Sequence, residues 1–441
     1  MSATVEHALG PDAPWRGVTD GAADDLRIDG LAPRFEATPA TPEELCAILR
    51  EAEKAGLAVC PRGAGSKTSR GQVPVRYDLA LKTTSLTGLL EYRPDDLVAV
   101  ARAGTPLREL QRSFSEHGQW LALDPADSAS ATIGGTLAAN TSGPHRYRYG
   151  TARDLVLGMQ VAYAGGTLAR SGAKVVKSVA GYDIHKLHIG ALGTLGVITE
   201  VALRLHPLPA SQQLVACAAP TVLGLAPVIE TLMHLPLGLG AMELVNAAGA
   251  ARLKSAGVNL PSGWLLLVLC EGHPRVVGRQ VDEVRRAAAS VSVAVSPVAT
   301  DTAAVALLDE ISRLTVPDER DTVVLKIAVP PGHTAAAIDG VEKLLAEFET
   351  SAQPVIQAHA GNGVVHVNLQ PQVAGISDIV QQLRHAAKGF RGHVTVLACP
   401  LDAKRQLDVW GETATPTLMR DLKAALDPRA VLNPGRFVHG L

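Results

Sequence analysis

A glycine-rich segment, Pro61-Arg-Gly-Ala-Gly-Ser-Lys-Thr68, has the composition of a loop that binds phosphate. Small residues in a row let successive backbone N–H groups turn to one side, and such a nest holds phosphate or pyrophosphate without steric conflict. The segment is not a P-loop, which needs Gly at Ser66, and it is not a Rossmann fingerprint, which needs Gly at Thr68. We expect a phosphate nest of another kind here, and an ordinary turn is the alternative.

Two further glycine clusters follow, Thr132-Ile-Gly-Gly-Thr136 and Gly190-Ala-Leu-Gly-Thr-Leu-Gly196. Paired glycines at the start of a helix permit close approach to a ligand and leave N–H groups pointing at an anion. The second cluster leads into an apolar strand at Val197–Ile198, and we expect its edge to hydrogen-bond an adenine ring. Glycine turns are common, so the three clusters together are a stronger signal than any one of them.

The segment His359-Ala-Gly-Asn-Gly-Val-Val-His366 predicts a hairpin with a tight turn at Asn362–Gly363. A hairpin brings both imidazoles together. Neutral imidazole binds metals, and protonated imidazole attracts carboxylates. We therefore consider His359 and His366 as catalytic, substrate-facing or metal-binding residues, and two ordinary hairpin histidines are the alternative.

The elements that must position these residues form two patterns. Thr41, Pro42 and Glu44 form a capping box at the start of a predicted helix over 42–55. A second helix is expected from Thr105 to Gly118. Strands are expected over 57–60 and 97–102.

A proline-rich linker over 205–213 ends this pattern. Beyond it, strands and helices alternate, and this predicts an α+β fold with helices on one face of an antiparallel sheet. Strands are expected over 214–218, 241–245, 264–270, 322–328, 354–359, 364–369 and 393–398, and helices over 222–233, 275–289, 335–348 and 376–388.

The composition excludes several classes of protein. Of 441 residues, 47% are hydrophobic and 19% are charged, which suits a large aliphatic core and excludes a mostly disordered chain. The net charge of −2 lacks the basic excess of nucleic-acid binders. Apolar runs such as Leu265–Cys270 are too short to span a bilayer, and Met1–Arg16 does not have the pattern of a secretory signal.

The five cysteines are widely spaced, and none forms a C-x-x-C pair. We expect free thiols in a reducing compartment and therefore a cytoplasmic protein. No thiolate metal site is expected.

A set of ordered motifs resembles the vanillyl-alcohol-oxidase (PCMH) type of FAD flavoprotein, and most closely the FAD-binding (E) subunits of bacterial glycolate oxidases. The resemblance covers residues 40–208 and 415–437 and is much weaker over 210–410. The motifs are Arg62-Gly-Ala-Gly-Ser66, Asp124-Pro125, Ala131-Thr-Ile-Gly-Gly135, Ser142-Gly-Pro144, Arg153-Asp-Leu-Val-Leu-Gly158, Val176-Lys-Ser-Val-Ala-Gly-Tyr-Asp183, Gly193-Thr-Leu-Gly-Val197 and the terminal Leu432-Asn-Pro-Gly-Arg436.

The resemblance implies a two-lobed FAD-binding domain over 1–208, an α+β cap domain over 209–410 and a segment over 411–441 that returns to the FAD domain. It also implies that Lys177, Tyr182 and Asp183 lie near the flavin and support the cofactor. The FAD-binding residues that it implies are Arg62, Gly63, Ala64, Gly65, Ser66, Asp124, Pro125, Thr132, Gly134, Gly135, Gly143, Val197 and Ile198.

Some members of the family attach FAD covalently through a histidine of the first glycine loop. Ser66 occupies that place here, and no histidine occurs between Arg62 and Val75. We therefore expect noncovalent FAD.

The resemblance implies a redox subunit that oxidises glycolate-like 2-hydroxy acids to 2-oxo acids. It would work with a catalytic flavoprotein subunit and an iron–sulfur subunit, and these partners would attach it peripherally to the inner membrane. One alternative is a self-sufficient FAD-dependent D-2-hydroxyacid dehydrogenase that uses His359 and His366. Such relatives carry a Glu-His pair near the C-terminus where this chain has Glu412-Thr413, so we expect the isolated chain to be inert. The other alternative is a redox-inactive structural or regulatory subunit.

Overall fold

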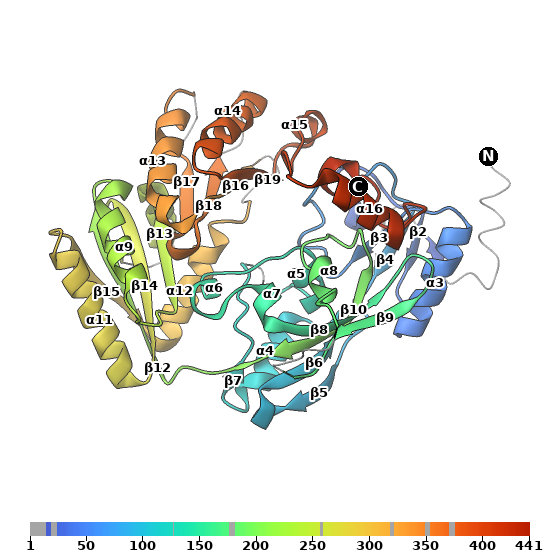
Figure 1. Cartoon of the computed structure of the whole chain (residues 1–441), viewed down its shortest axis with the longest axis horizontal. Helices are drawn as coiled ribbons and strands as arrows, with labels where there is room; N and C mark the ends of the chain where they lie inside the picture. Colours follow the sequence, from blue (N-terminus) through green and yellow to red (C-terminus); the bar gives the residue numbers. More distant parts are fainter. Residues whose placement is uncertain are drawn as a thin grey trace.

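The computed structural model describes residues 15–18, 24–126, 128–175, 181–255, 259–317, 322–348, 353–369 and 375–441. Its ribbon has two lobes, one with the N-terminal half of the chain and the other with a large sheet and its helices (Figure 1). Helices and mainly antiparallel sheets are mixed throughout, so the predicted α+β class is confirmed. Within the described residues, no helix is long and apolar enough to span a membrane.

The first lobe begins with a four-stranded sheet against which helix α3 (Pro42–Lys54) packs. Thr41 caps the helix as predicted, because its hydroxyl accepts a hydrogen bond from the N–H of Glu44 at 3.1 Å. The loop expected to bind phosphate leaves the sheet at the end of β3. The strands, in sheet order, are β1 (Arg16–Gly17), β2 (Phe35–Ala37), β4 (Leu79–Lys82) and β3 (Val59–Arg62).

A five-stranded antiparallel sheet completes this lobe, and short helices cover it. The strands, in sheet order, are β5 (Leu89–Arg93), β6 (Val98–Arg102), β10 (Val197–Arg204), β8 (Val156–Ala162) and β9 (Leu168–Gly172). The helices are α4 (Leu107–Ser115), α5 (Ile133–Ala138), α6 (Arg146–Tyr149), α7 (Ala152–Leu155) and α8 (His185–His188).

The proline-rich segment at 205–213 forms a short ladder before it enters the second lobe. Strand β11 (His206–Pro207) pairs with β7 (Gln119–Trp120). Pro207 thus lies in a two-stranded ribbon, where a missing N–H is tolerated, rather than in a central strand.

The second lobe is built on an eight-stranded antiparallel sheet, and all seven strands predicted after the linker belong to it. The unpredicted strand, β15, is at the edge of the sheet, where its Pro297 is tolerated and where its apolar alternation is weak. In sheet order the strands are β15 (Ala294–Thr300), β12 (Ser211–Ala219), β14 (Trp264–Gly272), β13 (Ala241–Val245), β17 (Val355–His359), β18 (Val364–Leu369), β16 (Val323–Ala328) and β19 (His393–Ala398).

Helices cover both faces of this sheet, so the expectation of helices on one face was wrong. The predicted helices share one apolar core with one face: α9 (Ala226–His234), α11 (Pro274–Ala289), α13 (Thr334–Leu345) and α14 (Ile376–Gly389). Two unpredicted helices, α10 (Ala247–Ser255) and α12 (Asp301–Arg313), cover the β15–β14 end of the opposite face. The β17–β19 end of that face carries polar side chains and borders the cavity described below.

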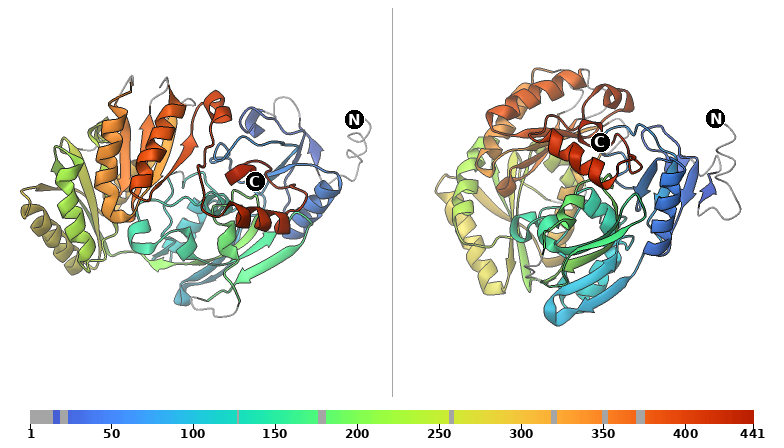
Figure 2. Two further views of the ribbon diagram at one scale, coloured as in Figure 1. Left: turned by 45° about the horizontal axis from the view of Figure 1, so that its top comes forward. Right: turned by 45° about the vertical axis from the view of Figure 1, so that its right-hand side comes forward.

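The C-terminal segment returns to the first lobe after α15 (Leu401–Gln406), and α16 (Pro416–Leu426) lies beside the N-terminal strands in all three views (Figures 1 and 2). The N–H of Val59 donates to Val431 O at 2.8 Å, and the N–H of Asn433 donates to Val59 O at 2.9 Å. These bonds place the terminal Asn433–Arg436 motif directly against the glycine loop.

Candidate functional site: a phosphate nest opening into a cationic cavity

The glycine loop forms one wall of a small cavity of about 80 Å³. Gly65 has a φ of +88°, a conformation that L side chains rarely adopt. A Cβ on Gly63 would collide with the hydroxyl of Thr132, which faces the loop across the cavity. Among the described residues, none of the backbone N–H groups from Gly63 to Ser66 donates to a protein acceptor. The loop therefore offers donors to a ligand, as the nest prediction requires.

Buried polar atoms around the nest support a bound polar ligand. Asn433 Oδ1 and Arg436 Nε line the nest, and Asn140 Oδ1 and Ser142 Oγ line the larger cavity beside it. In the described part of the chain these four atoms are buried without a hydrogen-bond partner, although buried polar atoms are nearly always paired. A pyrophosphate accepts hydrogen bonds and ribose hydroxyls both donate and accept them, so the residues present fit FAD. Ser66 lines the cavity where covalent attachment would need a histidine.

The N–H groups of Gly134 and Gly135 do not point at an anion, so that expectation was wrong. Gly134 donates to Ala103 O at 2.8 Å, and Gly135 donates to Thr132 Oγ1 at 3.2 Å. A Cβ on Gly134 would lie 2.7 Å from Ala103 Cβ, so this glycine allows the close packing of α5. Thr132 and Gly135 still line the nest.

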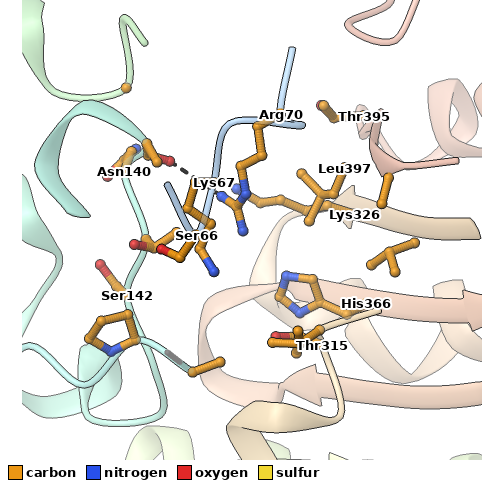
Figure 3. A pocket seen from close by; sticks show the side chains of 18 of the residues that line it. Ser66, Lys67, Arg70, Asn140, Ser142, Thr315, Lys326, His366, Thr395 and Leu397 are labelled. Atoms are coloured by element: carbon orange, nitrogen blue, oxygen red, sulfur yellow. Dashed lines mark hydrogen bonds between the residues drawn. The ribbon is translucent and has the colours of Figure 1, made fainter. Parts of the chain in front are cut away.

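A larger cavity of about 230 Å³ continues from the nest to the polar end of the eight-stranded sheet. Ser66, Lys67 and Thr141 line both spaces. Figure 3 shows the side chains of Lys67 and Arg70 from the loop and of His366 from the sheet facing the same space. The cationic and imidazole side chains that line the cavity are Lys67, Arg70, Arg146, Lys326, His359 and His366, and no Asp or Glu is among the described lining residues. This cavity therefore suits an anion.

Strand register brings these sheet residues together. Lys326 on β16 is directly opposite His366 on β18 and Thr395 on β19, and His366 is opposite Gln357 on β17. Side chains of directly opposite residues share a face of the sheet, so the four form a row across β17, β18, β16 and β19. Their neighbours along the strands, such as Leu325 and Ile356, point into the apolar core on the other face.

The predicted hairpin between His359 and His366 is confirmed, but its turn differs. His359 pairs with Val364, and between them Ala360–Asn362 form a 3₁₀ turn that is followed by Gly363 with a φ of +70°. Asn362 is not among the residues with positive φ, so this is not the two-residue turn that Asn-Gly favours. The imidazole centroids are 5.7 Å apart at right angles.

A chain of hydrogen bonds determines which nitrogen of His366 carries its proton. The buried carboxylate of Glu243 on β13 can only accept, so Gln357 must direct Nε2 towards Glu243 Oε2. Gln357 Oε1 then faces His366 Nδ1 at 3.0 Å, and this nitrogen must be the donor. The lone pair of His366 is consequently on Nε2. His359 Nδ1 lies 2.7 Å from the other oxygen of Glu243.

Burial and the surrounding positive charge lower the pKa values of His366 and Lys326. Burial, followed by the charges of His359, Lys326, Arg146 and Arg70, lowers the pKa of His366 well below its usual value. Burial, Arg146 and Arg70 lower the pKa of Lys326 to about 8. At neutral pH the cavity therefore contains a neutral imidazole beside a largely protonated lysine.

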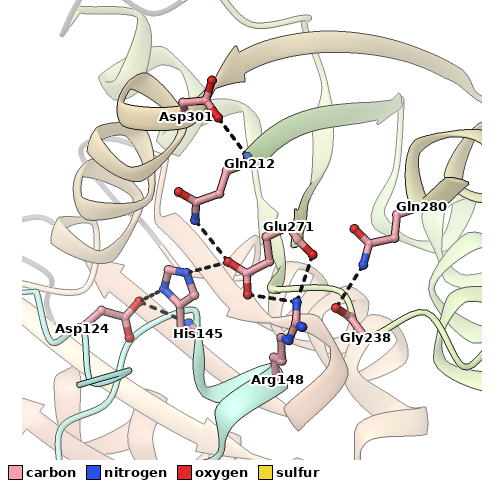
Figure 4. Close-up of polar contacts among 8 residues, drawn as sticks. All are labelled: Asp124, His145, Arg148, Gln212, Gly238, Glu271, Gln280 and Asp301. Carbon is pink, nitrogen blue, oxygen red and sulfur yellow. Dashed lines mark hydrogen bonds and ion pairs between the residues drawn. The ribbon is translucent and has the colours of Figure 1, made fainter. Parts of the chain in front are cut away.

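A second polar cluster joins the two lobes beside the cavity (Figure 4). Asp124 Oδ2 accepts hydrogen bonds from His145 Nδ1 at 2.7 Å and from the His145 N–H at 3.2 Å. His145 Nε2 is 3.6 Å from Oε2 of Glu271 on β14, and Arg148 Nη1 is 3.3 Å from Glu271 Oε1. A Cβ on Gly143 would collide with the backbone oxygen of Asp124, so only glycine fits there.

The remaining predicted site residues are distributed as follows. Arg62, Ala64 and Gly65 line the nest, and Pro125 and Gly143 line the cavity.

Val197 and Ile198 are buried at the start of β10, and neither lines the nest or the cavity. Both pair with β8 on one side, and the pairing of β10 with β6 begins only at Glu200. The adenine contact that we expected at this edge stays a prediction.

Two residues of the 176–183 motif are exposed. Tyr182 is 86% exposed and Asp183 forms an ion pair with Lys186 at 2.7 Å. Neither lines the nest or the cavity, and the support that we expected them to give the cofactor stays a prediction. Lys177 lies outside the described residues.

Glu412 also faces solvent, where it pairs with Lys388 at 3.0 Å. The part of the chain that the structure describes contains no group of three or more His, Cys, Asp or Glu side chains placed to bind a metal ion.

Sequence reasoning missed four residues at this site: Glu243, Gln357, Arg146 and Lys326. Lys326 interrupts an otherwise apolar strand, and Gln357 lies two residues before His359. A polar residue inside a buried strand was the available signal. Glu243 gave the same signal inside the apolar strand Ala241–Val245. Arg146 carried no such signal, because only the packing of α6 against β13 brings it to the sheet.

Comparison with known proteins gives two matches that together cover most of the chain. Residues 33–172 match the family described as "FAD binding domain". Residues 208–397 and 401–437 match "FAD linked oxidases, C-terminal domain". The second match includes the segment that returns to the first lobe.

Curated relatives span most of the chain. It is 25% identical to glycolate oxidase subunit GlcD of Bacillus subtilis, over 90% of this chain and 87% of that protein. It is 30% identical to mitochondrial D-2-hydroxyglutarate dehydrogenase of Bos taurus, over 98% and 82%, and 29% identical to D-lactate dehydrogenase of Archaeoglobus fulgidus, over 91% of each.

Solved structures share the fold. The chain resembles p-cresol methylhydroxylase with substrate bound, with a TM-score of 0.75 at 14% identity, over 99% of this chain and 97% of that one. It resembles 4-ethylphenol oxidase from Gulosibacter chungangensis with the same TM-score at 16% identity, over 98% and 96%. The resemblance to PCMH-type flavoproteins is thereby confirmed.

Proposed function

This chain belongs to the FAD-linked oxidases, and from that premise we propose that it oxidises small 2-hydroxy acids to 2-oxo acids as the FAD-binding subunit of a glycolate oxidase type of complex. The chemistry is that of an FAD-dependent oxidoreductase acting on CH–OH groups. The observation that carries the proposal is the cavity that opens from the nest, which is lined by cations and imidazoles and by no described carboxylate. A small carboxylate fits such a space by charge.

Arg146 and Lys326 are the residues that we assign to the substrate carboxylate. Arg146 Nε is buried and has no hydrogen-bond partner within the described structure, and Lys326 extends from the middle of the polar row. A guanidinium and an ammonium that line the same cavity would neutralise the carboxylate and orient the hydroxyl-bearing carbon. FAD, when bound, supplies the acceptor for the hydride that leaves this carbon.

His366 is the residue that we assign to the hydroxyl proton. Oxidation of a hydroxy acid removes a hydride from carbon and a proton from oxygen, and the proton needs an acceptor within reach. Nε2 of His366 carries the lone pair, because Gln357 holds Nδ1 as a donor. The lowered pKa keeps the imidazole neutral at physiological pH.

The test is an anaerobic titration of the purified holoprotein with glycolate and D-lactate, followed by the visible absorbance of the flavin. Bleaching only after addition of a catalytic flavoprotein subunit and an iron–sulfur subunit supports the complex, with electrons leaving to the iron–sulfur partner. Absence of bleaching in both cases contradicts the proposal and supports a redox-inactive subunit.

A second candidate is a self-sufficient dehydrogenase, and the placement of His366 favours it. In that case the isolated holoprotein bleaches rapidly with a 2-hydroxy acid. His366→Asn then abolishes bleaching while FAD stays bound, since His366 lies outside the nest. The exposed His393→Asn is the matched control and bleaches at the wild-type rate.

A further inference from the structure

The contacts of α6 distinguish it from a simple surface turn. Tyr147 packs on the hairpin turn, where a Cβ on Gly361 would collide with its ring. Arg146 lines the cavity. Arg148 donates to the backbone oxygen of Glu271 at 3.0 Å. The position of this four-residue helix therefore determines where the Arg146 guanidinium lies.

His145 precedes α6 and is almost completely buried between two carboxylates. Its side chain is 3% exposed, that of Asp124 is 14% exposed and that of Glu271 is fully buried. Trp120 closes the site, with its ring 4.7 Å from the imidazole. Asp124 is followed by Pro125, which lines the cavity, and Glu271 belongs to the large sheet. One imidazole thus contacts a carboxylate from each lobe.

The electrostatics require His145 to be an imidazolium. Burial alone would disfavour its charge, but Asp124 and Glu271 outweigh burial and raise its pKa to about 10. Among the described residues, the other charged or titratable groups facing the cluster are Arg146, Arg148 and Tyr149 on α6 and Asp309 on α12. With His145 protonated, the charges of Asp124, His145, Glu271 and Arg148 alternate and sum to zero. Without that proton, a net negative charge would be buried, which is strongly unfavourable.

From this geometry we propose that His145 is a positioning residue: as an imidazolium between Asp124 and Glu271 it fixes α6 against the large sheet and so directs Arg146 to the substrate carboxylate. The inference rests on the proposed function, because it assigns the carboxylate to Arg146. It adds a buried ion-pair network between the two lobes, which neither the nest nor the polar row contains. His145 itself does not line the cavity.

The experiment measures the affinity of the FAD-loaded protein for oxalate, an unreactive carboxylate probe similar in size to glycolate, from the change that it causes in the flavin spectrum. We expect His145→Gln to weaken oxalate binding about tenfold or more, because it frees α6 to shift and the Arg146 guanidinium then loses its position at the carboxylate; in catalysis, a shift of about 1 Å in a positioned group can cost on the order of a hundredfold. FAD content should stay unchanged, because His145 is outside the nest.

The double variant H145Q/E271Q separates positioning by charge from simple packing. It removes one positive and one negative charge, so Asp124 and Arg148 again balance, and we expect most of the oxalate affinity to return. A role of the imidazole in shape alone predicts no recovery. His206→Gln is the control, because the His206 ring packs against Tyr149 of the same helix, with ring centroids 4.8 Å apart, and His206 lies outside the cavity.

Three outcomes are decisive. Weaker binding in H145Q with recovery in the double variant supports the inference. Equal affinity of wild type and H145Q, or a double variant as weak as H145Q, overturns the inference while leaving the proposed function intact. Failure of wild-type holoprotein to bind oxalate contradicts the cationic substrate site itself. If H145Q does not fold, the charge-balanced double variant is compared directly with wild type, and a tenfold loss of affinity there overturns the charge mechanism.

Discussion

Single residues determine how the phosphate nest and the adjoining cationic cavity would bind anions. The nest uses backbone N–H groups, which need glycine, whereas the cavity uses side-chain charge. Gly65 is the clearest example of the first kind, since its φ of +88° is closed to most side chains. Lys326 is the clearest example of the second, since burial and the charges of Arg146 and Arg70 lower its pKa to about 8.

Gly65→Val should abolish FAD binding and leave a folded apoprotein. A Cβ at this position would lie 2.5 Å from the Arg62 guanidinium, and the branched side chain would occupy the space of the pyrophosphate. Flavin absorbance per mole of purified protein measures the loss, and circular dichroism checks the fold. Gly278→Val is the matched control, because a Cβ there has open space. Near-normal flavin content in the Gly65 variant would remove the loop from the FAD site.

Carboxylate affinity should decline as the pH rises through about 8. Below this pH Lys326 is protonated and attracts the carboxylate, and above it the free protein loses this charge, so binding must take up a proton. Lys326→Met should weaken glycolate binding and remove the pH dependence, because Arg146 keeps its charge throughout this range. Flavin-monitored titrations at pH 6 to 9.5 test this. An unchanged slope in the variant would exclude Lys326 from the site.

At the scale of elements, the β17–β18 hairpin holds both histidines at the cavity. Its register places His366 opposite Lys326 and Gln357, and a slip of one residue would turn all of them into the apolar core. The turn therefore matters as much as the histidines. Gly363 closes the turn with a φ of +70° and lies against the backbone of Val329. The N–H of Val329 donates a hydrogen bond to Gly363 O at 2.8 Å.

Gly363→Ala should destabilise the protein. The left-handed conformation costs a non-glycine residue about 1–2 kcal/mol, and the new Cβ would collide with the Val329 carbonyl, which must then move. A fall of several degrees in the thermal unfolding midpoint of the holoprotein is expected. Gly332→Ala serves as the comparison, since it is nearby and has open space. If both variants melt together with wild type, the turn tolerates a side chain.

At the scale of the whole molecule, the last twenty residues complete the first lobe. The Lys423 ammonium, with a side chain only 8% exposed, donates to Asp427 at 2.6 Å, Thr194 O at 2.7 Å and Leu432 O at 2.9 Å. Asp427 in turn accepts from the N–H groups of Val431 and Leu432. This buried pair fixes the terminal motif beside the nest.

Lys423→Met should lower the free energy of unfolding by about 3–5 kcal/mol, because it leaves the Asp427 carboxylate buried without its counter-charge. Denaturant unfolding of the holoprotein measures the change. Lys388→Met provides the contrast, since its pair with Glu412 is exposed and should contribute at most about 1 kcal/mol. Equal effects of the two substitutions would contradict a structural role for the buried pair.

The sequence by itself determined the features that depend on local chemistry. The Thr41 cap of α3, the glycine loop after β3 and the hairpin of His359 and His366 follow from residue types and spacing within a few positions. The predicted capping box is only half formed, because the Glu44 side chain accepts from the N–H of Ala40 and not from that of Thr41. The strands of the large sheet were predictable for the same reason, since buried strands read as apolar runs. The weakly amphipathic α10 and the edge strand β15 were missed because small or exposed residues leave little pattern.

Only the tertiary structure decided which residues share the site. Arg146, Lys326 and His366 come from three separate stretches of chain. The register of the sheet and the packing of α6 against β13 bring them to one cavity. The tertiary structure also gave the N–H groups of Gly134 and Gly135 acceptors within the protein, against expectation. The physical reason is that spacing along the chain determines only contacts within one or two turns. A binding site forms by the packing of distant elements, and its hydrogen bonds and pKa values depend on which side chains that packing brings into contact.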